Sequence, residues 1–420
     1  MSITRRELLA SAAVAPLLSA TASGATTDIS TKLPAKNEFA RMAFTYLDAG
    51  SVHPMSLGAQ AALENYLRYR TLDRAAGAYQ MAAVERRVLE AFATLVGASV
   101  EELSFIQSTT MGENLVIQAL GLPQGGGRIV TDVLHFFGSF YTYGELGKAG
   151  MDVVSLRMTS DGRIDMNEMA AAIDSRTKLV AVSLVSTVNG FEHDLKKICE
   201  LAHAHGAYVY ADIVHAAGAI PVNLHATGVD FAAASTYKWL MGDFGLGFLY
   251  VRKDVQEKLR RPWWGYHQVA SFDTHVLPYD TPGDDVATYA SSSDASGRFA
   301  MGTISWTGLV HLDHSLAWLN RIGIDTIQAW RQPLIDALQR ELRRRGYEPL
   351  TPLQSKTPLV AFALQDARAK LAQRLSAANV RITLSRHRFR ISLAVFNDMN
   401  DVRAVLDALP MSPDEAVTSG

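Results

Sequence analysis

The sequence predicts an α/β protein with a mostly parallel sheet covered on both faces, followed by a smaller α+β C-terminal domain. From about residue 37 to residue 251, short runs rich in β-branched residues alternate with amphipathic helical runs. The strand runs are apolar almost throughout, which is typical of parallel strands buried on both faces. After residue 251 the alternation becomes irregular, and two further strand runs are mixed with several helical ones.

Six apolar runs predict the strands of the main sheet, because each has the length and composition of a single buried strand. They are GGRIVTD (126–132), MDVVSLRM (151–158), KLVAVSLVS (178–186), AYVYAD (207–212), DFAAAS (230–235) and GLGFLYVR (245–252). Two linking segments, DMNEMAAAID (165–174) and LKKICELAHAHG (195–206), predict helices. Gly206 is expected to end the second helix, as glycine commonly does at a helix C-terminus.

Further divisions of the chain follow from composition. Residues 37–60 are predicted to be an N-terminal segment that joins the small domain and lines the active site, and residues 61–300 to be the large domain. Residues 301–412 are predicted to form the C-terminal α+β domain, with the strands TPLVAFAL and RFRISLAV, and residues 413–420 a flexible tail. The aromatic and proline-rich segment 260–285 predicts a long functional loop rather than a series of strands.

The composition excludes several classes of protein. The formal net charge is −2, whereas nucleic-acid-binding proteins usually carry a basic surplus, so we expect no nucleic-acid partner. The single cysteine, Cys199, excludes an internal disulfide and a multi-cysteine metal site. Two histidine pairs, in HAHG and HLDH, have no acidic partner at a spacing suited to a metal. We therefore expect no metal site.

Residues 1–25 differ in kind from the rest of the chain. Arg5 and Arg6 precede an apolar run (8–18) and the small-residue triplet ATA (20–22). This is the layout of a secretory signal, and TRRELL resembles the twin-arginine signal, whose translocation machinery carries folded proteins across the bacterial inner membrane. The prediction is a periplasmic protein, cleaved at the triplet or shortly after it; a basic helix of the mature fold is the alternative. No membrane span is expected in the mature chain.

Polar residues gather where predicted strands end, which is where ligands bind in an open parallel sheet. Asp212 ends one strand, with His215 three residues on, and Ser235 ends the next, with Lys238 three residues on. The run STTMGEN (108–114) opens a helix after the strand-like LSFIQ. Each feature alone also has an ordinary explanation, as a turn former, a structural histidine or a helix cap.

Together these residues suit one cofactor, pyridoxal 5'-phosphate. Its aldehyde bonds to a lysine amine, which is nucleophilic near neutral pH only when it is partly desolvated. Its ring nitrogen needs a carboxylate to stay protonated. Its phosphate suits hydroxyl groups and the free N–H groups of a helix N-terminus. Lys238, Asp212 and the Ser108–Thr110 turn supply all three groups.

At these residues the chain resembles fold-type I pyridoxal-phosphate enzymes of the class V aminotransferase family, which includes isopenicillin N epimerase-like and cysteine desulfurase-like members. The resemblance runs from TYLDAGSVHP to RFRISLAVFNDMNDV and implies a large domain with a seven-stranded sheet. Its most specific part matches the D-x-x-Q/H and S-x-H-K motifs. These imply Asp212 at the pyridine nitrogen, His215 beside the cofactor O3′ and Lys238 as the attachment point. Ser235 and Tyr237 are implied phosphate contacts, and Tyr237 stands where the family has histidine.

Shorter motifs imply further cofactor contacts. STTMGEN is similar to the phosphate turn NTTEGIN, which places Thr109 and Thr110 at the phosphate. TDVLHFFGSF is similar to the D-x-E-H segment, in which the ring of His135 is implied to stack on the cofactor. Phe136 is the alternative stacking residue, and Leu134 stands where an acid is usual.

Other motifs imply a partner subunit and a substrate clamp. SLVSTVNG is similar to SHVSNVTG, which places Thr187 near O3′. RFAMGTISW is similar to RFExGT, whose threonine reaches the neighbouring subunit's phosphate, so Thr303 implies a homodimer, although Ala300 replaces the acid. Arg390 matches the arginine that grips the carboxylate of an amino-acid-type substrate, with Ser51 beside it; a surface arginine is the alternative.

The resemblance implies that a substrate amine displaces Lys238, which then removes the α-proton. Transamination is the expected reaction, with epimerisation or C–C or C–S lysis as alternatives, the lysis because PWWGYH resembles kynureninase-like enzymes. Cysteine desulfuration is not expected, because it uses a cysteine shortly before the carboxylate-binding arginine, whereas Cys199 lies elsewhere. A non-catalytic, exported pyridoxal-phosphate-binding protein is the alternative of another class.

Overall fold

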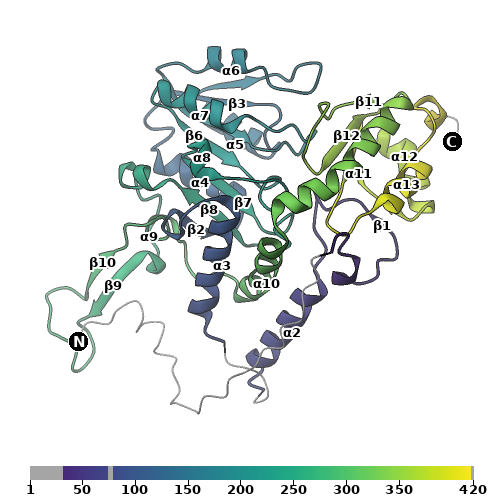
Figure 1. Ribbon diagram of the computed structural model, residues 1–420. Coiled ribbons are helices and arrows are strands. Elements are labelled where there is room, and N and C mark those ends of the chain that lie inside the picture. The colour runs from purple at the N-terminus through teal and green to yellow at the C-terminus, as the bar shows by residue number, and fades with distance from the viewer. Residues whose placement is uncertain (1–31, 74–78, 418–420) are drawn as a thin grey trace.

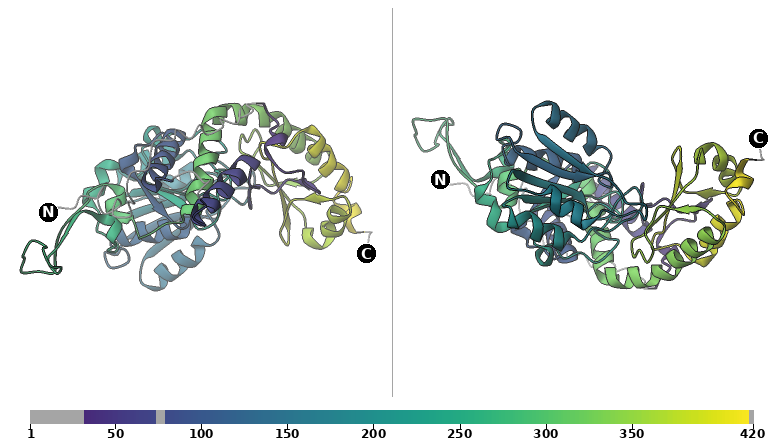
Figure 2. Two further views of the ribbon diagram at one scale, coloured as in Figure 1. Left: turned by 90° about the horizontal axis from the view of Figure 1, so that it is seen from below. Right: turned by 90° about the horizontal axis from the view of Figure 1, so that it is seen from above.

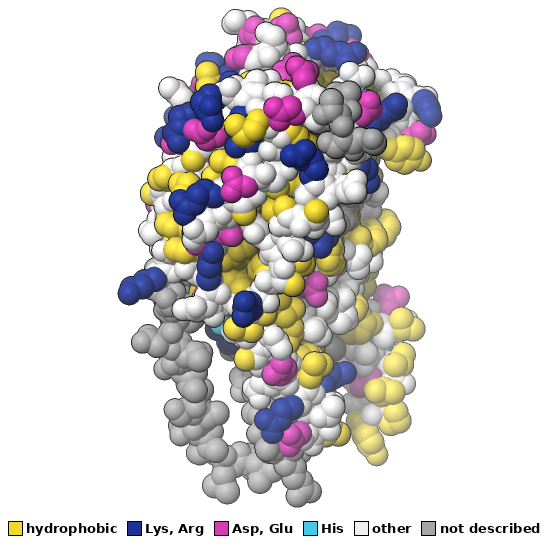
Figure 3. All heavy atoms as spheres, turned by 90° about the vertical axis from the view of Figure 1, so that its right-hand side faces the viewer, with side chains coloured by type: hydrophobic (Ala, Val, Ile, Leu, Met, Phe, Trp, Pro, Cys, Tyr) yellow, Lys and Arg dark blue, Asp and Glu magenta, His cyan; other side chains and the backbone are white. Residues whose placement is uncertain are grey.

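The computed structural model describes residues 32–73 and 79–417, and Figure 1 shows their arrangement. The predicted signal segment, 1–25, lies outside the described residues. No described helix combines the length and the apolar character that crossing a membrane requires. On the face drawn in Figure 3, basic and acidic side chains are interspersed, in keeping with the near-neutral composition.

A seven-stranded sheet forms the centre of the large domain and confirms the predicted α/β fold. The strand order is β2-β8-β7-β6-β5-β3-β4. The bounds are β2 (Leu103–Ile106), β3 (Arg128–Asp132), β4 (Asp152–Leu156), β5 (Thr177–Ser183), β6 (Tyr208–Asp212), β7 (Phe231–Ser235) and β8 (Gly247–Val251). Only β8 runs antiparallel to its neighbours β2 and β7, and the other pairs are parallel. All six predicted strands are therefore present.

The central strands of this sheet bury alternate residues in two different cores. In β7, for example, Phe231 and Ala233 point into one core while Ala232 and Ala234 point into the other. This arrangement explains the near-continuous apolar strands of the sequence, because neither face of the sheet is left to solvent. The helices that cover the faces are α3 (Met81–Val96), α4 (Thr109–Ala119), α5 (Ser139–Lys148), α6 (Met166–Ala172), α7 (Leu195–Ala204), α8 (Leu224–Thr227), α9 (Ala295–Phe299) and α10 (Trp306–Ile322).

The smaller unit has a four-stranded antiparallel sheet with the order β11-β12-β15-β14. Its strands are β11 (Glu348–Pro349), β12 (Leu359–Ala363), β14 (Thr383–Leu384) and β15 (Arg388–Ser392), and its helices are α11 (Ile324–Arg344), α12 (Ala367–Ala377) and α13 (Met399–Ala408). The N-terminal segment joins this unit, because β1 (Thr45–Tyr46) pairs with β13 (Val380–Arg381). The hydrophobic core of this unit consists of Leu47 and of residues from Leu334 onward. The buried residues of α10 belong instead to the core of the large domain, and α10 packs against α2 (Leu57–Arg70) and α3.

The segment 260–285 contains a strand, so its prediction as a loop was wrong. β9 (Val269–Thr274) pairs antiparallel with β10 (Ala287–Ser291), and the hairpin projects from the body of the molecule (Figure 2). The side chains of both strands are half-buried or exposed, so no alternation of apolar and polar residues marks them in the sequence. Short 3₁₀ helices complete the chain at Lys36–Glu38, Val100–Glu102, Lys253–Lys258, Tyr266–Gln268 and Asp414–Val417.

Candidate active site

The carboxyl ends of β6 and β7 bring the predicted cofactor residues together. Asp212 is the last residue of β6 and Ser235 the last residue of β7, and the turns that follow carry His215 and Lys238. The Lys238 Nζ lies 3.1 Å from the His215 Nε2. Because β6 and β7 are parallel neighbours, the two turns leave the sheet at the same edge.

Lys238 is a buried amine, with 8% of its surface exposed. Burial lowers its pKa to about 8, which Asp212 and Asp48 oppose and the charge of Arg390 reinforces. More of Lys238 is therefore the free amine near neutral pH than would be the case for an exposed lysine. This is the form that attacks an aldehyde.

Asp212 is a buried carboxylate at the end of β6. One carboxyl oxygen accepts the Val214 N–H at 2.9 Å. Burial raises the pKa of Asp212, and the nearby charges of His135 and Lys238 only partly offset this. A protonated ring nitrogen would add a further donor and a further positive charge beside this carboxylate, so the residue fits the pyridine end of pyridoxal phosphate.

The N-terminus of α4 meets the end of β7 at the predicted phosphate site. Ser108 caps the helix by accepting the Met111 N–H, and the Thr109 N–H lies 3.3 Å from the Ser235 Oγ. Thr110 is exposed in the first turn. Hydroxyl groups and backbone N–H groups at a helix N-terminus suit a phosphate.

Tyr237 differs from the expectation of a simple phosphate contact. Its ring stacks on Phe244, with ring centres 4.5 Å apart, and the Lys238 Nζ lies 5.5 Å from the ring centre. Its carbonyl accepts the His53 N–H at 2.9 Å. The ring of Tyr237 therefore packs between Phe244 and the amine of Lys238. Its role as a phosphate contact stays a prediction.

His135 belongs to a fully buried polar cluster that the sequence did not reveal. Its Nε2 lies 3.0 Å from the Glu113 Oε1, and its Nδ1 lies 2.9 Å from the Ser183 Oγ. Ser139 and Tyr143 also donate hydrogen bonds to Glu113. Burial alone would lower the pKa of His135, but the hydrogen bond and charge of Glu113 outweigh burial and leave it raised. Each partner therefore favours the charged form of the other.

Two departures from the motifs indicate that the acid beside His135 has moved to another element. In STTMGEN the acid stands where NTTEGIN has isoleucine, and in TDVLHFFGSF Leu134 stands where an acid is usual. Leu134 is buried in the large core, and the acid that contacts His135 comes from α4 instead. The alternative stacking residue, Phe136, packs against Phe137 at a centroid distance of 4.7 Å.

Arg390 lies at the site and not at the surface, with 3% of it exposed. It donates to the Thr187 carbonyl at 2.9 Å and hydroxyl at 2.8 Å, and to the Ser51 hydroxyl at 3.1 Å. The hydroxyl of Thr383 also accepts from it, and Asp48 lies 3.8 Å away. Burial lowers the pKa of Arg390 to about 10, with a further contribution from the charge of Arg388.

Thr187 and Ser51 were thus predicted site residues that the structure places around this guanidinium. Asp48 and Thr383 were missed, although Asp48 stands in the quoted motif YLDAGSVHP. The buried Arg390 Nε has no partner among the described residues, so the guanidinium keeps capacity for an anion.

Thr303 and Cys199 have no contact with Arg390 or Lys238 among the hydrogen bonds described above. In the described part of the chain, the Thr303 hydroxyl bonds the Tyr266 hydroxyl at 2.5 Å, so the neighbouring-subunit role and the homodimer stay predictions. Cys199 is buried on α7, and burial raises the pKa of its thiol to about 12. No cluster of three or more metal-ligating side chains occurs among residues 32–73 and 79–417.

Comparison with known proteins assigns the family. The sequence profile of the family Aminotransferase class-V matches residues 60–405. A protein named probable cysteine desulfurase from Methanothermobacter thermautotrophicus is 31% identical over 289 residues, covering 67% of this chain and 68% of that protein. A cysteine desulfurase from Shigella sonnei is 28% identical over 274 residues, covering 63% of each chain. The chain thus spans less than two thirds of the Shigella protein.

A solved structure agrees in fold. The cysteine desulfurase CsdA from Escherichia coli superposes with a TM-score of 0.77 at 22% identity, covering 91% of this chain and 98% of that chain. The chain belongs to the class V aminotransferase family, and it is a pyridoxal-phosphate-dependent enzyme of fold type I. The predicted cofactor and fold class are therefore confirmed.

The prediction that the chain is not a cysteine desulfurase is contradicted by these relatives, which carry that name. The error came from resting the prediction on one missing cysteine before Arg390. A single residue type is a weaker indicator of relationship than similarity over several hundred residues.

The Glu113–His135 pair makes stability depend on pH. The lowered pKa of Glu113 contributes stability above its usual 4.5, and the raised pKa of His135 contributes stability below its usual 6.5. We expect Glu113→Gln to lower the free energy of unfolding most between these values, by about 3 to 5 kcal/mol. The loss should shrink as pH rises through the pKa of folded His135. Urea unfolding across pH measures it, with exposed Glu64→Gln on α2 as control. A loss independent of pH would contradict the ion pair.

Proposed function

We propose that this enzyme acts at the α-carbon of a free amino acid and cleaves the C–S bond of a cysteine-type substrate. The observation that carries the proposal is one buried site in which the Lys238 amine lies near Asp212 and Arg390. The names of its curated relatives support the choice of a sulfur-containing substrate. C–S lysis was one of the alternatives that the sequence left open.

Each residue has a task that its surroundings explain. Pyridoxal phosphate, when bound, supplies a sink for the electrons of a bond broken at the α-carbon. Asp212 would keep the ring nitrogen protonated, and the start of α4 would hold the phosphate. Arg390 orients the substrate by its carboxylate. Lys238, with its pKa near 8, takes the α-proton and returns a proton, because its free and protonated forms are both populated near neutral pH.

The sulfur acceptor would come from outside the chain. Cys199 is the one cysteine, and its buried thiol on α7 has a raised pKa. In the proposed reaction the external thiol loses its proton, and the thiolate attacks the sulfur of the substrate as the C–S bond breaks, which forms a persulfide on the external thiol. The electron pair of the broken C–S bond stays on the β-carbon, which takes up a proton and forms alanine.

Transamination is a second candidate, because it uses the same Lys238, Asp212 and Arg390 but no thiol. The position of Cys199, on a helix of the large domain rather than beside Arg390, favours it. Its products differ from those of desulfuration, since the amino group would stay on the cofactor and a keto acid would leave.

The products of cysteine separate these reactions. We expect the loaded enzyme with cysteine and dithiothreitol to release alanine and sulfide in equal amounts, and Lys238→Ala to lose both the visible band of the bound cofactor and this activity. Pyruvate and ammonium instead of alanine would indicate elimination. Bleaching of the band with release of a keto acid would indicate transamination and contradict desulfuration. A wild-type protein without the visible band would contradict the cofactor site itself.

Arg390→Gln tests the carboxylate clamp. A charge-assisted, paired contact contributes about 1.5 to 3 kcal/mol, so we expect KM for cysteine to rise roughly 10- to 100-fold. Cysteamine, which has the amine and thiol of cysteine but no carboxylate, provides the control, since its binding should be almost unchanged. If both compounds bind more weakly by the same factor, Arg390 maintains the fold of the site and does not bind the carboxylate.

We also propose that the loaded, folded enzyme is exported by the twin-arginine pathway, which Arg5 and Arg6 would specify. Replacing both by lysine preserves the charge but removes the guanidinium pair, and should leave the protein in the cytoplasm. Cell fractionation with an enzymatic assay measures this. Equal periplasmic activity for the lysine variant would contradict the pathway.

A further inference from the structure

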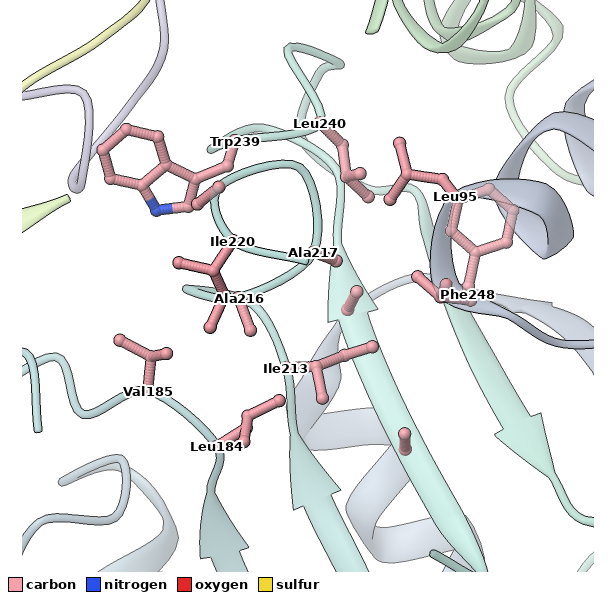
Figure 4. Close-up of a cluster of buried hydrophobic side chains, with 14 of the residues drawn as sticks. Leu95, Leu184, Val185, Ile213, Ala216, Ala217, Ile220, Trp239, Leu240 and Phe248 are labelled. Carbon is pink, nitrogen blue, oxygen red and sulfur yellow. The ribbon is translucent and has the colours of Figure 1, made fainter. Parts of the chain in front are cut away.

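A buried hydrogen-bonded chain connects Trp239 to the active-site lysine. The indole Nε1 donates to the His215 Nδ1 at 3.2 Å, and the His215 Nε2 lies 3.1 Å from the Lys238 Nζ. The exposed fractions of Trp239, His215 and Lys238 are 4%, 1% and 8%. Figure 4 shows the indole beside the turn that carries Ala216 and Ile220, with its nitrogen toward that turn.

The donors in this chain determine the tautomer of His215. An indole N–H can only donate, so the His215 Nδ1 must accept and carries no proton. Burial is the main cause that lowers the pKa of His215 well below its usual value, with the charge of Arg390 and, whenever Lys238 is protonated, the charge of Lys238 adding to it, so the ring is neutral. The single ring proton is therefore on Nε2, and that N–H points at Lys238.

A ring N–H at 3.1 Å needs an acceptor, and a lysine accepts only through the lone pair of its free amine. We propose that Trp239 is a positioning residue: its indole N–H fixes the Nε2–H tautomer of His215, which holds Lys238 as the free amine that reacts with the cofactor aldehyde. The proposal rests on the cofactor site and is independent of which substrate bond is cleaved.

The other groups around Lys238 favour different protonation states of its amine. Asp212 and Asp48 both favour its ammonium form, whereas burial and Arg390 favour the free amine. The ring of Tyr237, 5.5 Å from Nζ, also suits a cation. The His215 N–H adds a contact that only the free amine can accept.

The indole cannot easily move away from His215, because the two turns are closely packed. Gly218 has φ +84°, and a side chain there would place its Cβ 2.4 Å from the Trp239 carbonyl oxygen. The Arg331 guanidinium, fully buried, donates to the neighbouring Ala219 carbonyl at 2.7 Å. Backbone contacts thus hold Trp239 against the turn that carries His215.

The direct test is nitrogen NMR of the histidine rings in the full chain freed of cofactor, with His215 assigned by the loss of its signals in His215→Gln. We expect the wild-type ring to carry its proton on Nε2. In Trp239→Phe, which keeps an apolar ring in place, we expect a mixture of tautomers or an imidazolium. A wild-type His215 with its proton on Nδ1 would overturn the proposal, whatever the variant does.

A second readout follows the lysine itself. The rate at which the full chain takes up pyridoxal phosphate, measured by the visible band, should rise with pH as Lys238 loses its proton. In Trp239→Phe we expect this profile to move to higher pH, so that uptake is several-fold slower at about pH 7 and equal to wild type at high pH. Unchanged tautomer and unchanged profile would show that the indole only packs, and would overturn the proposal.

Trp318→Phe is the matched control. Trp318 lies on α10, is 2% exposed, and its indole nitrogen has no hydrogen-bond partner among the described residues. Its replacement removes a buried indole of equal size but no contact to His215. If Trp318→Phe moves the uptake profile as much as Trp239→Phe, general loosening of the core explains the shift and the proposal fails.

Discussion

Lys238 is buried, and burial disfavours the charged form of its amine. The groups around it determine how far its pKa falls. Desolvation pulls its pKa down, while Asp212 and Asp48 pull it up, and the balance leaves both protonation states accessible near neutral pH. The parallel sheet makes this balance achievable, because β6 and β7 end side by side and deliver Asp212 and Lys238 from adjacent turns.

The two histidines of the site illustrate how one residue type takes two charge states. His135 meets the carboxylate of Glu113, which outweighs burial and raises its pKa. His215 meets the indole N–H of Trp239, which offers no negative charge, and burial with two nearby cations lowers its pKa. In each case the partner at one ring nitrogen sets the charge or the tautomer of the ring.

The surroundings of Arg390 are assembled from three parts of the chain. Thr187 follows a strand of the large sheet, Ser51 and Asp48 belong to the N-terminal segment, and Arg390 and Thr383 belong to the small unit. The guanidinium therefore depends on the packing of both units for its orientation. The same arrangement leaves one of its buried nitrogens, Nε, without a hydrogen-bond partner in the described chain.

The sequence by itself determined the alternation of strands and helices, the cofactor and the residues that local motifs carry, such as Asp212, His215 and Lys238. Apolar periodicity and short motifs suffice there, because each reports on a strand, a turn or a helix end. The hairpin β9–β10 escaped prediction because it buries little and so shows no periodicity. Only the tertiary structure placed Glu113 on His135, Asp48 beside Arg390 and Trp239 on His215. These pairs join residues from different elements, and the geometry that sets their hydrogen bonds and charge states exists only after the sheet and its turns have packed.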